Sequence, residues 1–373
     1  MTTEIKERLQ HKTRIEMVYA GGTISSLATP QGHREGGHVV DLVGRLQDRF
    51  TDFGDSFDLG EAQVAYTGLS ENMDEDYWNS IETSVLGALS KNPNAIIITH
   101  GTDSMEQTAR YLQRRLITQL KQRQAKVILT GANEDLSHPR TDAWDNLHFA
   151  FESSEADVED GVYVAFHRKL IPADLVVKEP FSGSEMNYVA TTDEAYIQSQ
   201  NTQQQLDQEQ AKRVKASLGQ DAVVNNVLLY PVNVVRTDHK DFLNQVEQTK
   251  PRAVLLRLYH SGTANTEKPE LSVAELVIEL RARGIVAFGV TENGEPVDLH
   301  SYETSVKLRE AGVIPLYNMT ERVALVKLGM VKAENKTGLI DKMLDDISGE
   351  IDTSRIITED IKQLKELYGQ PAE

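Results

Sequence analysis

The sequence predicts an α/β fold with two domains, a larger N-terminal domain with a mainly parallel sheet flanked by helices and a smaller C-terminal α/β domain. Short apolar runs alternate with stretches of helical spacing, which is typical of parallel sheets covered on both faces. A polar stretch between about Thr192 and Gln220 interrupts this alternation, which then resumes. The 373 residues, 39% of them apolar, are enough for two cores of ordinary size.

The N-terminal half carries the longer series of alternating elements. Thr13–Ser26 predicts a strand that ends at a pair of glycines. The Gly-, Ser- and Pro-rich segment Ser25–His38 predicts a loop long enough to cover a site. Further strands are expected at Glu61–Tyr66, Ala95–Ile98, Lys126–Thr130 and Gly161–Phe166, and helices at Asp74–Leu89, at Thr141–Glu152 and after Asp103.

The domain boundaries follow from this pattern. We expect a polar lead-in at 1–12, the N-terminal α/β domain at 13–200, a linker at 201–222 and the C-terminal domain at 223–373. The last 39 residues, from Asn335, show helical spacing without strand patterns, so the tail is expected to pack as helices on the surface. Before it, strands are expected at 224–232, 253–259 and 285–290, and helices at Asp238–Gln248, Lys268–Arg283 and Ser301–Ala311.

Composition excludes several classes of function. The formal net charge of −18 opposes binding to nucleic acid, because a polyanion would be repelled. The chain has no cysteine, which rules out disulfides and thiolate chemistry. The N-terminus lacks the apolar core of a signal peptide, and no run approaches the roughly 20 apolar residues of a membrane span. We therefore expect a cytoplasmic protein without a nucleic-acid or membrane partner.

Cofactor and metal signatures are also missing from the sequence. There is no G-x-G-x-x-G or phosphate-binding loop, so no nucleotide cofactor is implied. Asp135, His138 and Asp142 lie close together in sequence, but their spacing matches no metal motif. We expect chemistry that needs neither a cofactor nor a metal.

The segment Ala95–Arg110 carries the clearest functional signal. Its apolar strand runs into Thr102 and Asp103, and a helical pattern follows. Asp103 and Glu106 have the spacing of an N-cap and a capping box, so Thr102 and Asp103 are expected at the carboxyl end of a strand. Ligands of open α/β sheets bind at this edge.

A second strand end has a similar composition. Gly21, Gly22 and Thr23 follow the first predicted strand, and paired glycines let a backbone approach a ligand closely. Two threonines at two strand ends, Thr23 and Thr102, would then border one crevice.

These two segments resemble the signature segments of the bacterial-type L-asparaginase family. The matching sequences are YAGGTI around Thr23 and ITHGTDSMEQTA around Thr102. Ser301–Leu328 is similar to the C-terminal part of the cytoplasmic, type I branch. The resemblance covers roughly residues 13–332 and implies an asparaginase/glutaminase-like fold. Shorter matches occur at Leu69–Met73, Leu129–Ala132 and Asp142–Leu147, and at Lys178.

The resemblance implies catalytic roles for four residues. Thr23 is similar to the nucleophile that forms an acyl-enzyme with the substrate amide. Thr102, Asp103 and Lys178 are similar to a second triad that arranges proton transfer and activates water. A lysine in that role needs a desolvated setting, and the apolar residues 175–177 before Lys178 are compatible with burial.

Substrate recognition is implied in the same way. Ser70 resembles the residue that binds the α-carboxylate, and Asp103 resembles the carboxylate that holds the α-ammonium. Gly22 and Gly101, in the two signature turns, are expected to border the substrate. Glu71 stands where many relatives have a neutral residue; it either adds a carboxylate beside the ammonium or is a solvated turn residue.

His33 is the other departure from the family. Type I relatives have Gly-Tyr in the loop after the nucleophile, whereas this chain has Gly32-His33. His33 either replaces that tyrosine as the catalytic proton acceptor or is an exposed loop residue.

Three functions remain open. The first is hydrolysis of L-asparagine or a related amide such as glutamine or D-asparagine. The second is the ammonia-producing subunit of a tRNA-dependent amidotransferase, although the 22 residues before Thr23 leave no room for the additional N-terminal domain of those proteins. The third is a non-catalytic amino-acid sensor. The resemblance also implies a homodimer or homotetramer acting on a small amino-acid amide.

Overall fold

The chain divides into two compact units, Met1–Asp193 and Glu194–Glu373. The computed structural model describes residues 12–25, 27–28, 34–35, 42–50, 56–182, 185–219, 226–232, 239–291 and 294–369. The expected lead-in therefore lies outside the described residues except for Lys12, and so does His33. No helix of the described residues is long and apolar enough to cross a membrane.

The first unit is built on a mainly parallel sheet, which confirms the predicted fold class. Each strand pairs in parallel with its neighbours, except that β8 and β9 are antiparallel. The parallel strands have short, apolar runs because both faces of the sheet are covered. The sheet order is β4 (Phe57–Leu59), β1 (Thr13–Ala20), β6 (Ala95–His100), β7 (Lys126–Thr130), β8 (Val162–Phe166) and β9 (Lys169–Pro172), with β5 (Gln63–Tyr66) also on β1.

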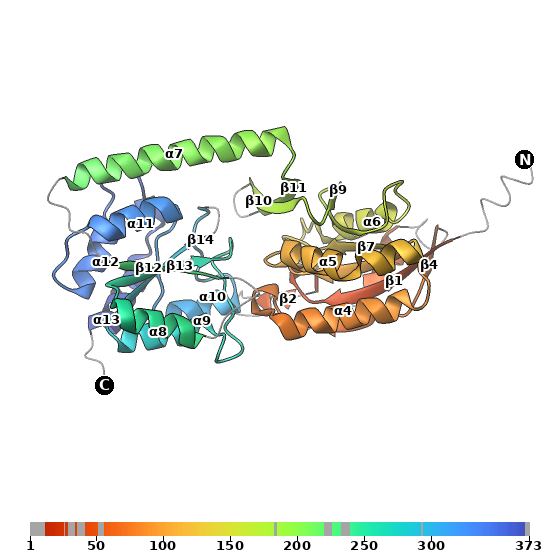
Figure 1. Cartoon of the computed structure of the whole chain (residues 1–373), viewed down its shortest axis with the longest axis horizontal. Helices are drawn as coiled ribbons and strands as arrows, with labels where there is room; N and C mark the ends of the chain where they lie inside the picture. The colour runs from red at the N-terminus through yellow and green to blue at the C-terminus, as the bar shows by residue number, and fades with distance from the viewer. Residues whose placement is uncertain are drawn as a thin grey trace, which may run out of the picture. The chain divides into compact units, whose positions relative to one another are not determined.

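Two pairs of helices cover this sheet. Helices α2 (Leu42–Arg49) and α6 (Ala143–Ser153) share one apolar cluster with alternate residues of β1 and β6. Helices α4 (Glu75–Leu89) and α5 (Met105–Arg123) pack against each other along the sheet (Figure 1). The helices expected at 74–89 and 141–152 are confirmed, and α2 was not expected.

Besides the pair of β8 with the unexpected strand β9, the first unit contains two further antiparallel pairs of strands that were not expected. Strands β10 (Val176–Ser182) and β11 (Glu185–Ala190) form a hairpin separate from the main sheet. Strands β2 (Leu27–Ala28) and β3 (Arg34–Glu35) pair within the segment predicted as a loop. That prediction was wrong for these residues.

The second unit begins with a long helix. Helix α7 (Glu194–Leu218) runs through most of the stretch assigned to a linker at 201–222. Val214 is the only fully buried residue among those described in this helix, so its faces are largely solvated. A solvated helix of this kind can have a polar sequence. In the structure the second compact unit starts after Asp193. The exact domain limits stay a prediction.

The core of the second unit is a four-stranded parallel sheet covered on both faces (Figure 1). Its order is β12 (Val227–Pro231), β13 (Ala253–Leu258), β14 (Val286–Thr291) and β15 (Ile314–Pro315). One face packs on α8 (His239–Thr249), α9 (Val273–Ala282) and α10 (Glu303–Ala311). The other face packs on α7, α11 (Glu321–Met330), α12 (Lys336–Leu344) and α13 (Thr358–Gly369).

The C-terminal tail is part of this core. Leu339, Met343, Ile361 and Leu364 of α12 and α13 are buried in the same cluster as the sheet residue Phe288. A short 3-10 helix, η3 (Thr353–Arg355), lies between α12 and α13. The expectation of helices is confirmed, but the expectation that they lie on the surface was wrong, because they cover one face of the sheet.

Candidate functional site

Two neighbouring strands bring the two signature threonines to the same edge of the first sheet. Strands β1 and β6 pair in parallel up to Ala20 and His100. Thr23 follows the first strand by three residues and Thr102 follows the second by two. Because parallel strands end at one edge, the two segments that carry these threonines lie side by side at their carboxyl ends.

The two segments approach each other so closely that both need glycine. Gly22 has φ +86°, and a Cβ there would stand 2.2 Å from the backbone nitrogen of Gly101. A Cβ on Gly101 would stand 2.4 Å from the Oγ of Ser70. Glycine at both positions therefore brings three backbone segments into contact at one place.

Thr23 begins a short 3-10 helix, η1 (Thr23–Ser25), and is 8% exposed. The turn before it is fixed by Ser25, whose backbone N–H and side-chain hydroxyl both donate to the Gly22 carbonyl oxygen at 2.9 and 3.1 Å. Gly22 in turn donates its N–H to the Gly68 carbonyl oxygen at 3.2 Å. The threonine is thus held on a well-anchored turn with little solvent contact.

Ser70 lies in the second 3-10 helix, η2 (Ser70–Asn72), and contacts the Thr102 segment directly. Its Oγ accepts the backbone N–H of Asp103 at 3.2 Å, and its carbonyl oxygen accepts the hydroxyl of Ser104 at 2.8 Å. Glu71 beside it is only 3% exposed. The alternative of Glu71 as a solvated turn residue is therefore wrong, because the carboxylate belongs to the buried part of this segment.

Asp103 forms a buried ion pair with Lys178. The lysine Nζ donates to the Asp103 Oδ1 at 3.1 Å, and the two side chains are only 5% and 7% exposed. Lys178 comes from β10, so the unexpected hairpin is the element that brings the lysine to the strand end.

The capping box predicted for Asp103 and Glu106 does not form. The N-cap of α5 is Ser104, whose side chain makes no capping hydrogen bond. The Asp103 carboxylate bonds to Lys178 instead, and Glu106 Oε2 accepts the backbone N–H of Lys178 at 2.8 Å. Both carboxylates are thus directed at β10 rather than at the amino end of their own helix.

Two further contacts hold the hairpin against the strand end. The hydroxyl of Tyr188, which pairs with Lys178 across the hairpin, donates to the Thr102 carbonyl oxygen at 2.6 Å. The Arg110 guanidinium donates to the Val176 carbonyl oxygen. Tyr188 is fully buried, and burial together with the carboxylates of Glu106 and Asp103 raises its pKa well above the ordinary value. Its phenol therefore stays protonated and donates.

The remaining atoms of the Thr102 segment differ in their partners. In the described residues the Thr102 hydroxyl makes no hydrogen bond, so it is available to a ligand. His100 is fully buried, and its Nδ1–H donates to the Gly101 carbonyl oxygen at 2.7 Å. Burial lowers the pKa of His100 to about 4, so its ring is neutral at neutral pH.

The Asn133–Asp142 loop is fixed from within. Asp142 accepts the backbone N–H of Asn133 at 3.0 Å and of Glu134 at 3.1 Å, and it lies 3.4 Å from the ring nitrogen of His167. Burial raises the pKa of Asp142, but these hydrogen bonds outweigh it and lower the pKa. Asn133 also exchanges two hydrogen bonds of 2.9 Å with the backbone of Met186 in β11. The loop therefore supports the hairpin that carries Lys178.

The structure thus gathers most of the residues singled out from the sequence. Gly22, Gly101, Ser70, Asp103 and Lys178 are joined by close approaches or hydrogen bonds. Thr23 and Thr102 lie on the segments that these contacts hold together, and His33 lies outside the described residues. Reasoning from sequence missed Tyr188, whose one available signal was its place in the apolar run before the polar stretch.

Comparison with known families shows which family the chain belongs to. A family model described as "Asparaginase, N-terminal" matches residues 14–211, which is more than half of the chain. The chain belongs to the asparaginase family. The matched region of this asparaginase-family protein contains every candidate site residue named above.

Curated relatives of this asparaginase-family protein include subunits of glutamyl-tRNA(Gln) amidotransferases. The one from Saccharolobus solfataricus is 28% identical over 305 residues, which cover 78% of this chain and 66% of that protein. The corresponding protein from Methanosphaera stadtmanae is 23% identical over 59% of this chain and 51% of that protein. The chain thus spans at most about two thirds of the length of these relatives.

Solved structures that match the chain include L-asparaginases. The thermostable L-asparaginase from Thermococcus kodakarensis is 21% identical, with a TM-score of 0.40 over 91% of this chain and 99% of that one. The probable cytoplasmic L-asparaginase from Campylobacter jejuni is 16% identical, with a TM-score of 0.41 over 90% of this chain and 100% of that one.

Proposed function

We propose that this protein hydrolyses the side-chain amide of L-asparagine to L-aspartate and ammonia through a threonine acyl-enzyme. The observation that supports it most is the buried Lys178–Asp103 ion pair beside Thr102, at the strand end next to the one that carries Thr23. Within an asparaginase-family domain, two threonine segments and a buried lysine at one sheet edge are a suitable setting for acyl transfer.

The proposed reaction has two steps. The Oγ of Thr23 attacks the amide carbon, its proton passes to the leaving nitrogen, and ammonia departs while an ester to Thr23 forms. Water then attacks the ester, and its proton returns to the Thr23 oxygen as aspartate leaves. Thr102, with its available hydroxyl, and Lys178, fixed by Asp103, are the groups proposed to relay these protons.

Recognition of the substrate uses the polar groups between the same segments. Asp103 is proposed to bind the α-ammonium, and the hydroxyl of Ser70 to bind the α-carboxylate. The Ser70 hydroxyl accepts the Asp103 N–H and lies close to Gly101. The two ends of a small amino acid would therefore be bound within one compact site. Glu71, buried next to Ser70, is proposed to add negative charge on the ammonium side.

The decisive test is an ammonia-release assay with Thr23→Ala and Thr102→Ala. Each variant is expected to lose several orders of magnitude in kcat with an unchanged circular dichroism spectrum, because members of a catalytic unit cannot replace one another. Thr83→Ala, which removes an exposed hydroxyl on α4, is the matched control and should keep full activity. Near wild-type turnover in either site variant would contradict its role.

The amidotransferase relatives support a second candidate, an ammonia-producing subunit. Comparing L-asparagine, L-glutamine and D-asparagine in the same assay separates the two. Fast release of ammonia from L-asparagine by the chain alone supports the hydrolase. Release that appears only when a partner protein is added supports the amidotransferase role. Binding of L-asparagine with no ammonia from any amide would support the sensor instead.

We also propose that the protein works in the cytoplasm as a homodimer or homotetramer. The proposal rests on its family rather than on any surface described above. Light scattering that gives a single particle of 41.7 kDa would contradict the assembly.

A further inference from the structure

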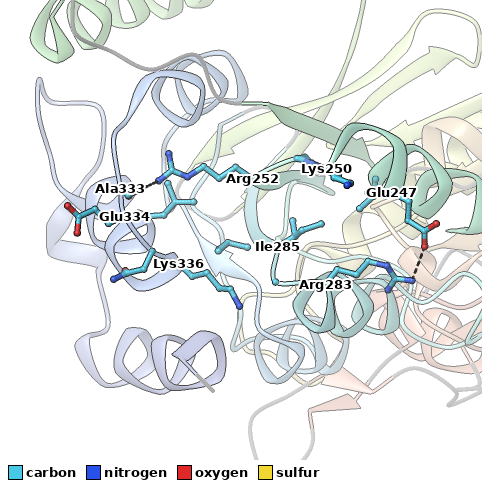
Figure 2. A pocket seen from close by; sticks show the side chains of 14 residues that line it. Glu247, Lys250, Arg252, Arg283, Ile285, Ala333, Glu334 and Lys336 are labelled. Carbon is cyan, nitrogen blue, oxygen red and sulfur yellow. Dashed lines mark hydrogen bonds and ion pairs between the residues drawn. The ribbon is translucent and has the colours of Figure 1, made fainter. Parts of the chain in front are cut away.

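A cavity of about 640 Å³ lies in the second unit, at the amino ends of β13 and β14 (Figure 2). Its wall is formed by the carboxyl ends of α8 and α9, the starts of the two strands and the segment that begins α12. None of the candidate catalytic residues lines it. The volume is in the range of pockets that bind small molecules, about 300–1,000 Å³.

The floor of the cavity is apolar. Val246, Ile285, Val286 and Leu339 line it, and each of these side chains is at most 6% exposed, so they are fixed by the core of the unit. A ligand seated on this floor would contact apolar atoms that are already shielded from water, so dispersion contacts would favour an apolar group there. The floor therefore suits an apolar body.

The rim is cationic although the whole chain carries a formal charge of −18. Arg252 is fixed in place because its guanidinium donates to the carbonyl oxygens of Val331 and Ala333 at 2.9 and 2.8 Å. The charge of Arg283 is offset by Glu247, 3.7 Å away, and by its own helix neighbour Glu279. The charged side chains of the lining are Lys250, Arg252, Arg283 and Lys336 against Glu247 and Glu334 (Figure 2).

The two lysines of the rim have no acidic partner in the described part of the chain. Neither ammonium makes a hydrogen bond or an ion pair there. The Lys336 ammonium lies next to Gly284, because a Cβ on Gly284 would stand 3.4 Å from the Lys336 Nζ. Lys336 thus lies over the turn at the cavity wall rather than extending into solvent away from it.

The place of Lys336 in its helix is unusual for a cation. Lys250 follows the carboxyl end of α8, where a positive charge is favourable. Lys336 is the first residue of α12, whose first turn contains no acidic residue. The amino end of a helix is itself positive, so a lysine there is unfavourable unless an anion is nearby. The Asn335 side chain caps this helix end by accepting the backbone N–H of Gly338 at 2.7 Å, so a bound anion would serve the ammonium of Lys336.

We propose that this cavity binds a small organic acid, with a carboxylate or phosphate attracted to its rim by the charges of Lys336 and Lys250, and with an apolar body on the floor formed by Ile285 and Leu339. The site is separate from the proposed amide hydrolysis, because all its lining residues belong to the second unit. Binding therefore stands or falls independently of catalysis.

The test is direct titration of the full chain with three matched probes, followed by calorimetry and thermal unfolding. Naphthalene-2-carboxylate and 2-naphthyl phosphate carry the anionic group, and 2-naphthylmethanol is the neutral counterpart. Both anions are expected to bind at least tenfold more tightly than the alcohol and to raise Tm as their concentration rises. The tighter of the two identifies the preferred head group. Inorganic phosphate, tested alone, should bind at least tenfold more weakly than 2-naphthyl phosphate.

Charge variants locate the site. Lys250→Gln and Lys336→Gln are each expected to weaken the preferred anion by about three- to tenfold, and the double variant by more, without changing affinity for the alcohol. Lys362→Gln, an exposed lysine of α13 outside the cavity, is the matched control and should bind as the native protein does. Equal binding of anion and alcohol, no binding at millimolar probe, or native affinity in the double variant would each overturn the proposal.

Discussion

The Nζ of Lys178 lies 3.1 Å from the Oδ1 of Asp103, and both side chains are almost fully buried. Removing one partner leaves the other charge without compensation, which costs about 3–5 kcal/mol for a buried pair. Lys178→Met is therefore expected to lose both activity and stability, measured by ammonia release and by urea unfolding. Lys169→Met, which removes a half-exposed lysine paired with Asp193 at 4.0 Å, should change neither by much.

A double variant separates charge from catalysis at this pair. Lys178→Met combined with Asp103→Asn removes both charges, so the free energy of unfolding should recover in part relative to Lys178→Met alone. Activity should not recover, because the proposed relay still lacks Lys178 and the proposed site for the α-ammonium has lost its carboxylate. A double variant as unstable as the single one would show that the loss comes from packing rather than from charge.

The hydroxyl of Tyr188 is expected to position Thr102. Tyr188→Phe removes the 2.6 Å hydrogen bond to the Thr102 carbonyl oxygen and leaves that partly buried acceptor without it. We expect a loss of about 1–3 kcal/mol in stability and a fall in kcat that is larger than any change in KM. Tyr163→Phe removes a 2.7 Å bond of the same kind, to the Glu159 carbonyl oxygen, and should leave kcat unchanged. An equal fall in both variants would exclude the positioning role.

Gly22 is expected to tolerate no side chain. Gly22→Ala places a methyl group 2.2 Å from the Gly101 nitrogen and also strains a backbone with φ +86°. Gly349→Ala supplies the strain alone, because Gly349 has φ +82° and open space around it, and it should cost about 1–2 kcal/mol. Thermal unfolding should show a clearly greater loss for Gly22→Ala, with activity abolished. Equal losses would mean that the two turns can separate.

A buried ion pair in the second unit predicts acid sensitivity. Lys327 and Glu350 are fully buried, 2.7 Å apart, and Ile347 also donates its backbone N–H to the glutamate. Burial raises the pKa of Glu350, but the Lys327 ammonium and the backbone donors outweigh it and lower the pKa to about 2.

Because the folded pKa lies below the unfolded one, this stabilisation is fully present above about pH 4.5 and is lost as pH falls towards 2. The linkage is on the order of 3 kcal/mol. The free energy of unfolding measured between pH 6 and 3 should fall less steeply in Glu350→Gln than in the native protein. Glu366→Gln, on α13, serves as the control, and its pH dependence should match that of the native protein.

The fold was predictable wherever the burial of an element produces a recognisable pattern of apolar residues in the sequence. The strands at 95–100 and 126–130 are covered on both faces, so they appear as continuous apolar runs. Helix α7 was not recognised because one buried residue in its 25 gives no periodic signal. The hairpin of β10 and β11 was missed because Lys178, Glu179 and Pro180 interrupt its apolar pattern.

The candidate site was predictable to the extent that it is local. Glycines and threonines adjacent in sequence, such as Gly22 and Thr23, identify a strand end by themselves. The partners of Thr102 are remote, since Tyr188 lies 86 residues further along the chain and contacts only its backbone oxygen. Every residue has a backbone carbonyl, so the residue type at position 102 does not indicate this hydrogen bond. A contact of this kind depends on tertiary structure and cannot be derived from either segment alone.

The contacts of Tyr368, close to the end of the chain, bear on how the second unit folds during synthesis. Its hydroxyl accepts the backbone N–H of Ala287 in β14 at 3.0 Å and donates to the Gly312 carbonyl oxygen at 2.8 Å, while its ring lies in the core of the second unit. During synthesis this sheet cannot acquire its final covering until residue 368 has left the ribosome, whereas the first unit ends at Asp193. The nascent chain should therefore display a folded first unit next to an incomplete second one.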